Sequence, residues 1–424
     1  MHARSAFIAV VLAGFSGRAF AQHEHHDAPA PELDARQALL DAAEAHDASG
    51  TAWQPASTPM YMWHWKVGEW AFGLHTNVSA GYANARGDRG DSQYLSTNWV
   101  MAMASHPVGD AQFQVRSMLS AEPWTVGDDG YPLLLQTGES IDGMPLHDRQ
   151  HPHDLFMELA MRYRRPISDS IGVELYFAPV GEPALGPPAF PHRFTAMPNP
   201  LAPLGHHWQD STHISAGVLT VGVFTRLLKV EGSWFNGREP DEIRYDLDFG
   251  APDSLAARVT VNPTDDTSAQ VSWARIDSPE ALEPDISVQR ATASLMWNRP
   301  LSFGDLALTG VFGRNMPSMG PATNAGLAES ALVLGHDHTI FSRAELLQKT
   351  GHDLVLPAEL DGQVYRIASF STGYVYDVTR LGDVVPGIGF VATVDAIGSD
   401  LAPYYGSRTP WGGMVFLRLR PPGK

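Results

Sequence analysis

Runs of alternating apolar and polar residues constrain this chain more than any other feature of its sequence. Within residues 228–235, bulky apolar side chains alternate with charged or small polar ones. The apolar set is Leu228, Val230 and Trp234, and the polar set is Lys229, Glu231 and Ser233. Successive side chains of a β-strand point to opposite faces, so this run predicts a strand with one apolar and one polar face. Similar runs at residues 112–121, 155–164 and 415–420 predict a sheet between two different environments.

The connections between these runs alternate between short and long. Short connections include residues 165–169, 226–227, 298–303 and 379–383, and long ones include residues 122–154, 179–212, 236–253 and 399–410. Short turns at one end and long loops at the other are typical of outer-membrane barrels, whereas a Greek-key sandwich would scatter its long connections. We therefore predict an all-β fold, an antiparallel transmembrane β-barrel of about 16 strands with short periplasmic turns and long extracellular loops.

The composition limits the alternatives. The 424 residues include no cysteine, so no disulfide stabilises the fold. After the N-terminal region, no stretch approaches the roughly 20 apolar residues of a membrane helix, so the chain crosses a membrane with strands or not at all. The net charge of −18 argues against nucleic acid as a partner, because phosphate binding needs a basic surface. The same charge favours the attraction of cations.

Three parts are expected along the chain. Residues 1–21 resemble a secretory signal peptide, with Arg4 before a short apolar run and small residues at the expected cleavage site. Residues 22–58 are polar with one weak helical pattern, which predicts a flexible, histidine-bearing periplasmic arm. Residues 59–424 are predicted to form the barrel, in contact with the lipid of a bacterial outer membrane.

Histidine is unusually frequent, and its 18 copies are clustered. The arm contains His23, His25 and His26; the first long loop contains His147, Asp148, His151, His153 and Asp154; the second contains His206, His207, Asp210 and His213. Imidazole and carboxylate groups together suit copper or zinc. These residues are therefore the predicted metal ligands, with a copper or zinc ion as the possible cofactor.

The two long loops are expected to fold inward together, because loops of roughly 30 residues with apolar anchors are functional rather than disordered. Such folding would bring His151 or His153 close to the histidines of residues 206–213. The alternative is that these side chains only hydrogen-bond within a folded lid, with Arg149 paired to an aspartate.

Residues 59–65 place the thioethers of Met60 and Met62 beside the imidazole of His64. Thioethers suit Cu(I), although an interfacial anchor of methionine and aromatic residues explains this segment equally well.

A hydrolase is a different functional alternative. His213 and Ser215 are two residues apart at the outer end of a predicted strand, and would share a lipid-facing surface. A nucleophilic serine needs such a base within reach, so a lipid or ester hydrolase is one alternative. A purely structural barrel is another.

Several segments resemble a family of uncharacterised bacterial outer-membrane proteins. They are residues 131–139, 148–160, 181–194, 206–215, 237–241 and 282–285. The resemblance covers most of the mature chain, and members of this family tend to occur beside copper and heavy-metal resistance genes. It implies a channel or a metal-interacting, copper-related barrel, with metal ions or small solutes as ligands, and it implies no specific site residues.

Overall fold

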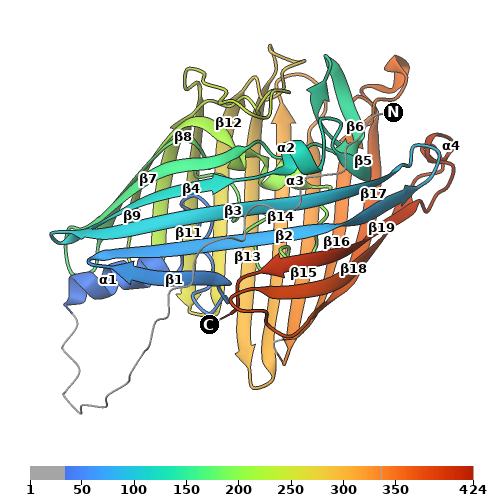
Figure 1. Cartoon of the computed structure of the whole chain (residues 1–424). Helices are drawn as coiled ribbons and strands as arrows, with labels where there is room; N and C mark the ends of the chain where they lie inside the picture. Colours follow the sequence, from blue (N-terminus) through green and yellow to red (C-terminus); the bar gives the residue numbers. More distant parts are fainter. Residues whose placement is uncertain (1–33, 336, 424) are drawn as a thin grey trace. The chain divides into compact units, whose positions relative to one another are not determined.

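Antiparallel strands form one large sheet that closes on itself (Figure 1). The structure, a computed structural model, describes residues 34–335 and 337–423. The ring consists of β2 (Trp70–Arg86), β3 (Ser92–Val108), β4 (Ala111–Leu119), β7 (Phe156–Pro166), β8 (Gly172–Gly181), β9 (Ser215–Phe224), β10 (Leu228–Phe235), β11 (Ser254–Thr264), β12 (Thr267–Asp277), β13 (Ser287–Leu301), β14 (Gly304–Pro317), β15 (Thr323–Leu334), β16 (His338–Thr350), β17 (Val364–Asp377), β18 (Val385–Ile397) and β19 (Trp411–Arg420). Residues 411–419 of β19 pair with residues 78–86 of β2 and close the ring. The predicted barrel of sixteen antiparallel strands is confirmed.

Further elements are not strands of the ring. β1 (Met62–Val67) pairs with residues 70–75 of β2, next to the stretch that β19 occupies. β5 (Tyr131–Ile141) and β6 (Met144–Gln150) form a separate hairpin between β4 and β7. The helical elements are α1 (Ala35–Ala45), α2 (Glu122–Thr125), α3 (His206–Gln209), η1 (Ser211–His213), η2 (Ala358–Leu360) and α4 (Ala402–Tyr405). Among the described residues, no helix has the length and apolar character needed to cross a membrane.

The strands have the two faces that their alternation predicts. In β10, Lys229 and Glu231 are at most 3 % exposed, whereas Val230 and Trp234 are 48 % and 49 % exposed on the outer surface. Alternation within residues 155–164 predicts Met157 on the apolar, outward face with Leu159 and Met161, but Met157 is only 1 % exposed at the start of β7 and packs inside the barrel. A register shift between β4 and β7, beside Met118, causes this difference, because a one-residue shift moves side chains to the other face.

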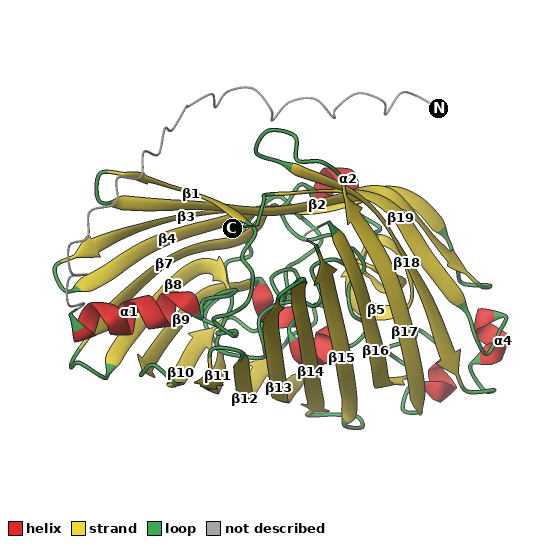
Figure 2. Ribbon diagram, turned by 90° about the horizontal axis from the view of Figure 1, so that it is seen from below, coloured by secondary structure: helices red, strands yellow, loops and turns green. Residues whose placement is uncertain are grey.

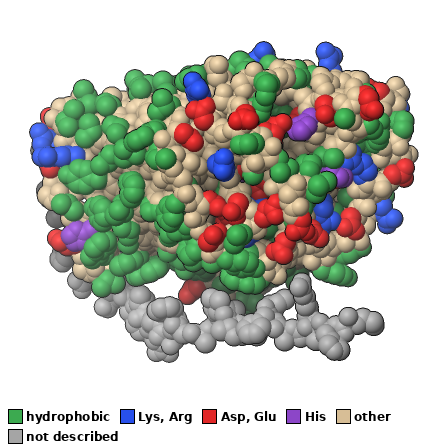
Figure 3. All heavy atoms as spheres, turned by 90° about the horizontal axis from the view of Figure 1, so that it is seen from above, with side chains coloured by type: hydrophobic (Ala, Val, Ile, Leu, Met, Phe, Trp, Pro, Cys, Tyr) green, Lys and Arg blue, Asp and Glu red, His purple; other side chains and the backbone are tan. Residues whose placement is uncertain are grey.

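Connections also alternate in length as predicted. Short turns such as residues 225–227, 265–266 and 302–303 lie at one end of the barrel, and long loops such as residues 120–155, 182–214 and 236–253 lie at the other. Seen from the long-loop end, acidic side chains gather near the middle of the surface, with histidines among them (Figure 3). The surface at the long-loop end is therefore acidic near its middle.

The inside of the barrel is filled by the connection between β8 and β9, residues 182–214, which we call the inward loop. Nearly all of its residues are buried, and loop segments with short helices lie within the ring of strands (Figure 2). Arg193 anchors the inward loop, because its guanidinium lies 2.7 Å from Glu329 of β15 and 2.9 Å from Asp210. Glu329 also pairs with Arg343 of β16 at 2.9 Å.

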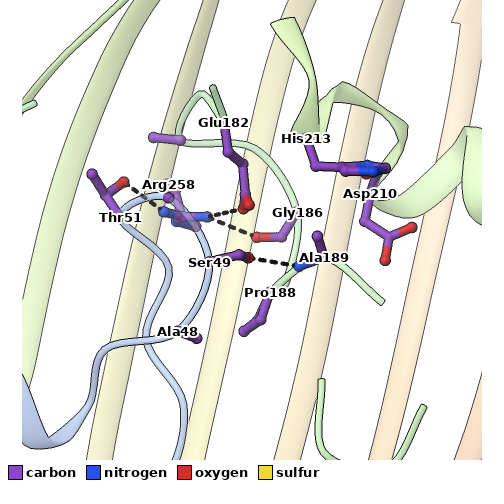
Figure 4. A network of polar contacts seen from close by, with 12 residues as sticks. Ala48, Ser49, Thr51, Glu182, Gly186, Pro188, Ala189, Asp210, His213 and Arg258 are labelled. Carbon is purple, nitrogen blue, oxygen red and sulfur yellow. Dashed lines mark hydrogen bonds and ion pairs between the residues drawn. The ribbon is translucent and has the colours of Figure 1, made fainter. Parts of the chain in front are cut away.

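Residues 34–58, the described part of the N-terminal segment, differ from the flexible arm expected for residues 22–58. The weak helical pattern does form a helix, α1, and Trp53 is buried with Leu39 and Leu40 of that helix. Arg258 of β11 donates to the hydroxyl of Thr51 at 2.9 Å, and the hydroxyl of Ser49 accepts from the inward loop (Figure 4). Residues 46–55 are therefore a packed part of the barrel interior, because buried charges of the wall need partners. The predicted signal peptide and His23, His25 and His26 lie outside the described residues.

Replacing Leu295 by arginine should destabilise the barrel, because Leu295 is 55 % exposed on the outer face of β13. An arginine that faces lipid near the bilayer midplane costs about 2–4 kcal/mol. Leu282→Arg is the matched control, since Leu282 is 45 % exposed in the loop between β12 and β13, and we expect a change within about 0.5 kcal/mol. Urea unfolding from lipid vesicles, followed by tryptophan fluorescence, measures both. Equal costs would contradict a lipid-facing Leu295.

Candidate functional site

Two connections bring five histidines together inside the barrel. His151 and His153 follow β6, His206 and His207 lie in α3, and His213 lies in η1. Each of the five is at most 8 % exposed. We call these five residues the histidine cluster.

Neighbouring rings of the histidine cluster contact one another in sequence. The distances between ring centroids are 6.1 Å for His151–His207, 5.3 Å for His207–His206, 5.2 Å for His206–His213 and 5.4 Å for His213–His153. The ring of Phe190 lies 5.1 Å from that of His206 and forms an apolar side of the group. The expected convergence of the two long loops is confirmed, whereas metal binding by these residues stays a prediction.

In three of the five rings, Nδ1 has an acceptor and Nε2 has no partner. The Nδ1 contacts are His153 to Glu122 Oε2 at 2.9 Å, His207 to Glu239 Oε1 at 3.4 Å, and His213 to the carbonyl oxygen of Asp210 at 2.9 Å. The corresponding Nε2 atoms are buried and have no hydrogen-bond partner among residues 34–335 and 337–423. A histidine that binds metal commonly has this arrangement, since one ring nitrogen donates to a carboxylate or carbonyl and the other is left for the ion.

Asp210 holds His206 in a fixed orientation. The distance from His206 Nδ1 to Asp210 Oδ1 is 2.7 Å, and Arg193 reaches the other oxygen of the same carboxylate at 2.9 Å. Burial alone would raise the pKa of Asp210, but its hydrogen bond with His206 and the charge of Arg193 hold that pKa well below its usual range. Asp210 therefore stays ionised and accepts a hydrogen bond from the imidazole.

Arg244 organises the opposite side of the site. It pairs with Glu139 and lies 3.2 Å from Asp154, and Glu139 Oε1 is 3.2 Å from His151 Nδ1. Burial raises the pKa of Glu139 to about 8 and that of Asp154 to about 6, although Arg244 opposes both shifts. These carboxyl groups can therefore take up or release a proton near neutral pH.

Burial keeps most of the imidazoles neutral. It lowers the pKa of His213 to about 3, and it also lowers the pKa values of His151 and His206 below 6.5. Burial acts in the same direction on His153, but the charge and hydrogen bond of Glu122 outweigh it and raise the pKa of His153. Neutral imidazole is the form that binds a metal ion, so much of the site is already in the ligating state.

The histidine cluster lines a cavity of about 10 Å³, which has room for about one water molecule or ion. In this arrangement the ring nitrogens of the histidine cluster are not directed at one common position. Among the described residues, the only three-donor group whose atoms lie within 4.8 Å of one another consists of Asp241, Asp246 and Asp248. To hold an ion, the imidazoles of the cluster would have to rotate toward the cavity.

His147 and Asp148 belong to a different set of contacts, contrary to the expected single site. Asp148 accepts from His147 Nδ1 at 2.8 Å and from Arg89 Nε at 2.8 Å. Its other oxygen accepts the backbone N–H of Leu135 at 2.7 Å. These contacts attach the β5–β6 hairpin to the loop after β2. His147 and Asp148 therefore fit the alternative in which these side chains only hydrogen-bond within the folded loops.

The hydrolase alternative required His213 and Ser215 on a lipid-facing strand surface, and the structure differs. Both residues are inside the barrel, at 8 % and 3 % exposed. The hydroxyl of Ser215 donates to the carbonyl oxygen of Thr212 at 3.0 Å, and His213 Nδ1 contacts the carbonyl oxygen of Asp210. The serine hydroxyl is therefore directed to the backbone rather than to an imidazole.

Four residues of the site did not emerge from sequence reasoning: Glu122, Glu139, Glu239 and Arg244. Glu122 and Glu139 lie in the long connection between β4 and β7, and Glu239 and Arg244 lie in the loop after β10, so their proximity depends on the folded barrel. Glu139 and Glu239 do lie within segments that carry the family resemblance, residues 131–139 and 237–241. A glutamate within such a segment was the available sequence signal for a site residue.

Comparison with known proteins gives structural likeness only. The chain matches no protein-family model and no curated protein sequence. The anion-selective porin of Comamonas acidovorans has a TM-score of 0.47 and 11 % identity, over 82 % of this chain and 99 % of the porin. OmpF of Salmonella typhi, in complex with daunomycin, has a TM-score of 0.51 and 8 % identity, over 84 % of this chain and 100 % of OmpF. The likeness to OmpF shows that the chain has a porin-like barrel fold.

Proposed function

We propose that this protein is an outer-membrane barrel that binds one transition-metal ion, copper or zinc, at the histidine cluster inside its lumen. The observation that carries the proposal is the set of three buried Nε2 atoms, of His153, His207 and His213, that have no partner among the described residues. A buried polar atom left unpaired costs about 1–3 kcal/mol. Once the imidazoles have rotated toward the cavity, one ion that accepts the three lone pairs would remove this cost.

The outer surface of the barrel supports the membrane location. Val221, Leu295 and Val415 are 55 %, 55 % and 62 % exposed, and each lies on the face of its strand that points away from the lumen. Strands can cross hydrocarbon only when every backbone group is paired, as in a closed ring. A bacterial outer membrane, with its lipid as the surrounding partner, fits this surface and the porin-like fold.

The donor set supports copper or zinc. Imidazole nitrogen suits both ions, and Cu²⁺ binds most tightly among the divalent ions of the first transition row. Carboxylates such as Asp154 and Glu239 line the same cavity and balance the charge of a divalent ion. The resemblance to proteins encoded beside copper resistance genes favours copper over zinc.

Zinc titrated into the full-length mature protein should bind at the histidine cluster. The starting protein carries His23→Ala, His25→Ala and His26→Ala, so that the N-terminal histidines do not compete. Adding His153→Ala and His213→Ala should weaken binding on the order of 10- to 100-fold, the range found even for outer partners of metal ligands. Isothermal titration calorimetry in detergent measures the affinity, and Cu²⁺ is titrated in the same way.

His147→Ala is the matched control for this experiment. It removes an imidazole from the same long loop, but one that contacts Asp148 rather than the cavity. The control should keep the parental affinity. If His153→Ala with His213→Ala also keeps it, the histidines serve only the structure of the loops.

A channel is the second candidate function, and the closed sixteen-stranded ring favours it. The inward loop fills the lumen, and the cavities lined by its residues include volumes of only about 10 and 30 Å³. A solute could pass only after this loop moves. The channel and metal-binding functions therefore involve the same segment of the chain.

Arg193→Ala should raise the ion conductance of the protein in planar bilayers. The variant removes one partner of two buried ion pairs, with Glu329 and Asp210, and such a change costs about 3–5 kcal/mol. The parent should conduct little. Arg149→Ala, which breaks a pair with the largely exposed Asp91, should leave conductance unchanged. A large steady conductance of the parent, equal to that of Arg193→Ala, would show that the loop does not close the lumen.

A further inference from the structure

A second group of metal-binding side chains lies on the wall of the barrel, apart from the histidine cluster. Strand register places Met62 of β1 opposite His75 of β2, His75 opposite Met101 of β3, and Met101 opposite Met118 of β4. Opposed residues of antiparallel strands project to the same face, with Cβ atoms about 4.5–5.5 Å apart. Three thioethers and one imidazole thus form a continuous row across four strands, which we call the methionine row.

The methionine row faces the interior of the barrel. His75, Met101 and Met118 are 2–3 % exposed, whereas Val100, next to Met101 in β3, is 38 % exposed on the outer face. Met62 extends over Gly73, where an added Cβ would lie only 2.7 Å from the Met62 sulfur. The missing side chain at Gly73 therefore gives this thioether its space.

The inward loop adds His192 to the methionine row. Its Nε2 atom lies 3.2 Å from the sulfur of Met118, and its ring centroid lies 5.7 Å from that of His75. A nitrogen and a sulfur at this distance are spaced like two ligands of one ion, whose bonds are about 2.0–2.3 Å long. The ring of Trp99 contacts both imidazoles, with centroids 4.6 Å from His75 and 4.7 Å from His192.

Packing alone explains the thioethers but not the imidazole of His75. Methionine commonly fills irregular spaces in protein cores. Within the described part of the chain, however, His75 Nε2 is buried without a hydrogen-bond partner, which packing leaves uncompensated.

The surroundings of the methionine row favour a soft, singly charged ion. Thioether sulfur prefers soft ions such as Cu(I), and the row itself contains no carboxylate. Arg116 lies 4.0 Å from the Met101 sulfur, and its positive charge opposes a divalent ion more strongly than a monovalent one. The face of an aromatic ring such as Trp99 attracts a cation.

We propose that Met118, His192 and His75 bind a soft monovalent cation of the Cu(I) or Ag(I) class, with Met101 and Met62 as further sulfur donors. This site does not depend on the function proposed for the histidine cluster. A cavity of about 30 Å³ is lined by both Trp99 and His153, so the two sites are neighbours. Their donor chemistry differs, because one offers thioether and imidazole and the other offers imidazole and carboxylate.

Silver titration tests the proposal directly, because Ag⁺ is stable in air and has the same ligand preference. The full-length mature protein with alanine at positions 23, 25 and 26 is titrated by calorimetry in chloride-free buffer. Met118→Leu preserves volume and removes the sulfur, and should lower Ag⁺ affinity on the order of 10- to 100-fold while leaving Zn²⁺ affinity unchanged. Met144→Leu is the matched control, since Met144 is 64 % exposed in the β5–β6 hairpin, and should keep the parental Ag⁺ affinity.

Equal Ag⁺ affinities of Met118→Leu and Met144→Leu would reduce the methionine row to core packing. If Met118→Leu does not assemble, X-ray absorption of the Ag⁺-loaded parent decides the question. Sulfur in the first coordination shell supports the site, and a shell of nitrogen and oxygen alone overturns it.

His153→Ala with His213→Ala should keep Ag⁺ affinity, and this result separates the site from the histidine cluster. Loss of Ag⁺ binding in that variant would instead assign the ion to the cluster.

Discussion

Every backbone amide of a strand in hydrocarbon must find its partner within the protein, because lipid offers none. The pairing of β19 with β2 meets this requirement by closing the ring, and the other features of the barrel follow from it. Closure gives each strand an outer and an inner face, so side chains must alternate. The outer face is apolar, which suits contact with lipid, and polar residues are left to the lumen.

The polar inner face creates a second requirement, because buried charges need partners. Lys229, Glu231 and Arg258 are at most 3 % exposed. Glu231 pairs with both cations within the wall, and further contacts of the cations reach segments that enter the barrel. Arg258 donates to Thr51 of the N-terminal segment and to the carbonyl oxygen of Gly186 in the inward loop. The wall thus holds in place the loop that carries most of the histidine cluster. The candidate site exists because the wall is charged.

Features that depend on local pattern could be predicted from the sequence, and features that depend on long-range pairing could not. Alternation in β10 predicted both faces, and the concentration of histidine in two adjacent loops predicted their convergence. The register shift beside Met118, which takes Met157 inside, depends on how β4 and β7 pair across a long loop. The burial of Trp53 and the contact of Glu122 with His153 likewise arise only when distant segments meet. The methionine row could not be seen without strand register, because its members are spread over residues 62–118.

The inward loop contributes His206, His207 and His213 to the histidine cluster and His192 to the methionine row. One movement of this loop out of the barrel would therefore break up the histidine cluster and remove His192 from the methionine row, so an open lumen and a complete set of ligands are mutually exclusive states. An ion that uses ligands from the inward loop binds the inward state more tightly, and thereby stabilises it in proportion to the logarithm of the ion concentration. By the same linkage, a solute that needs the open state would bind in competition with the ion although it occupies a different place.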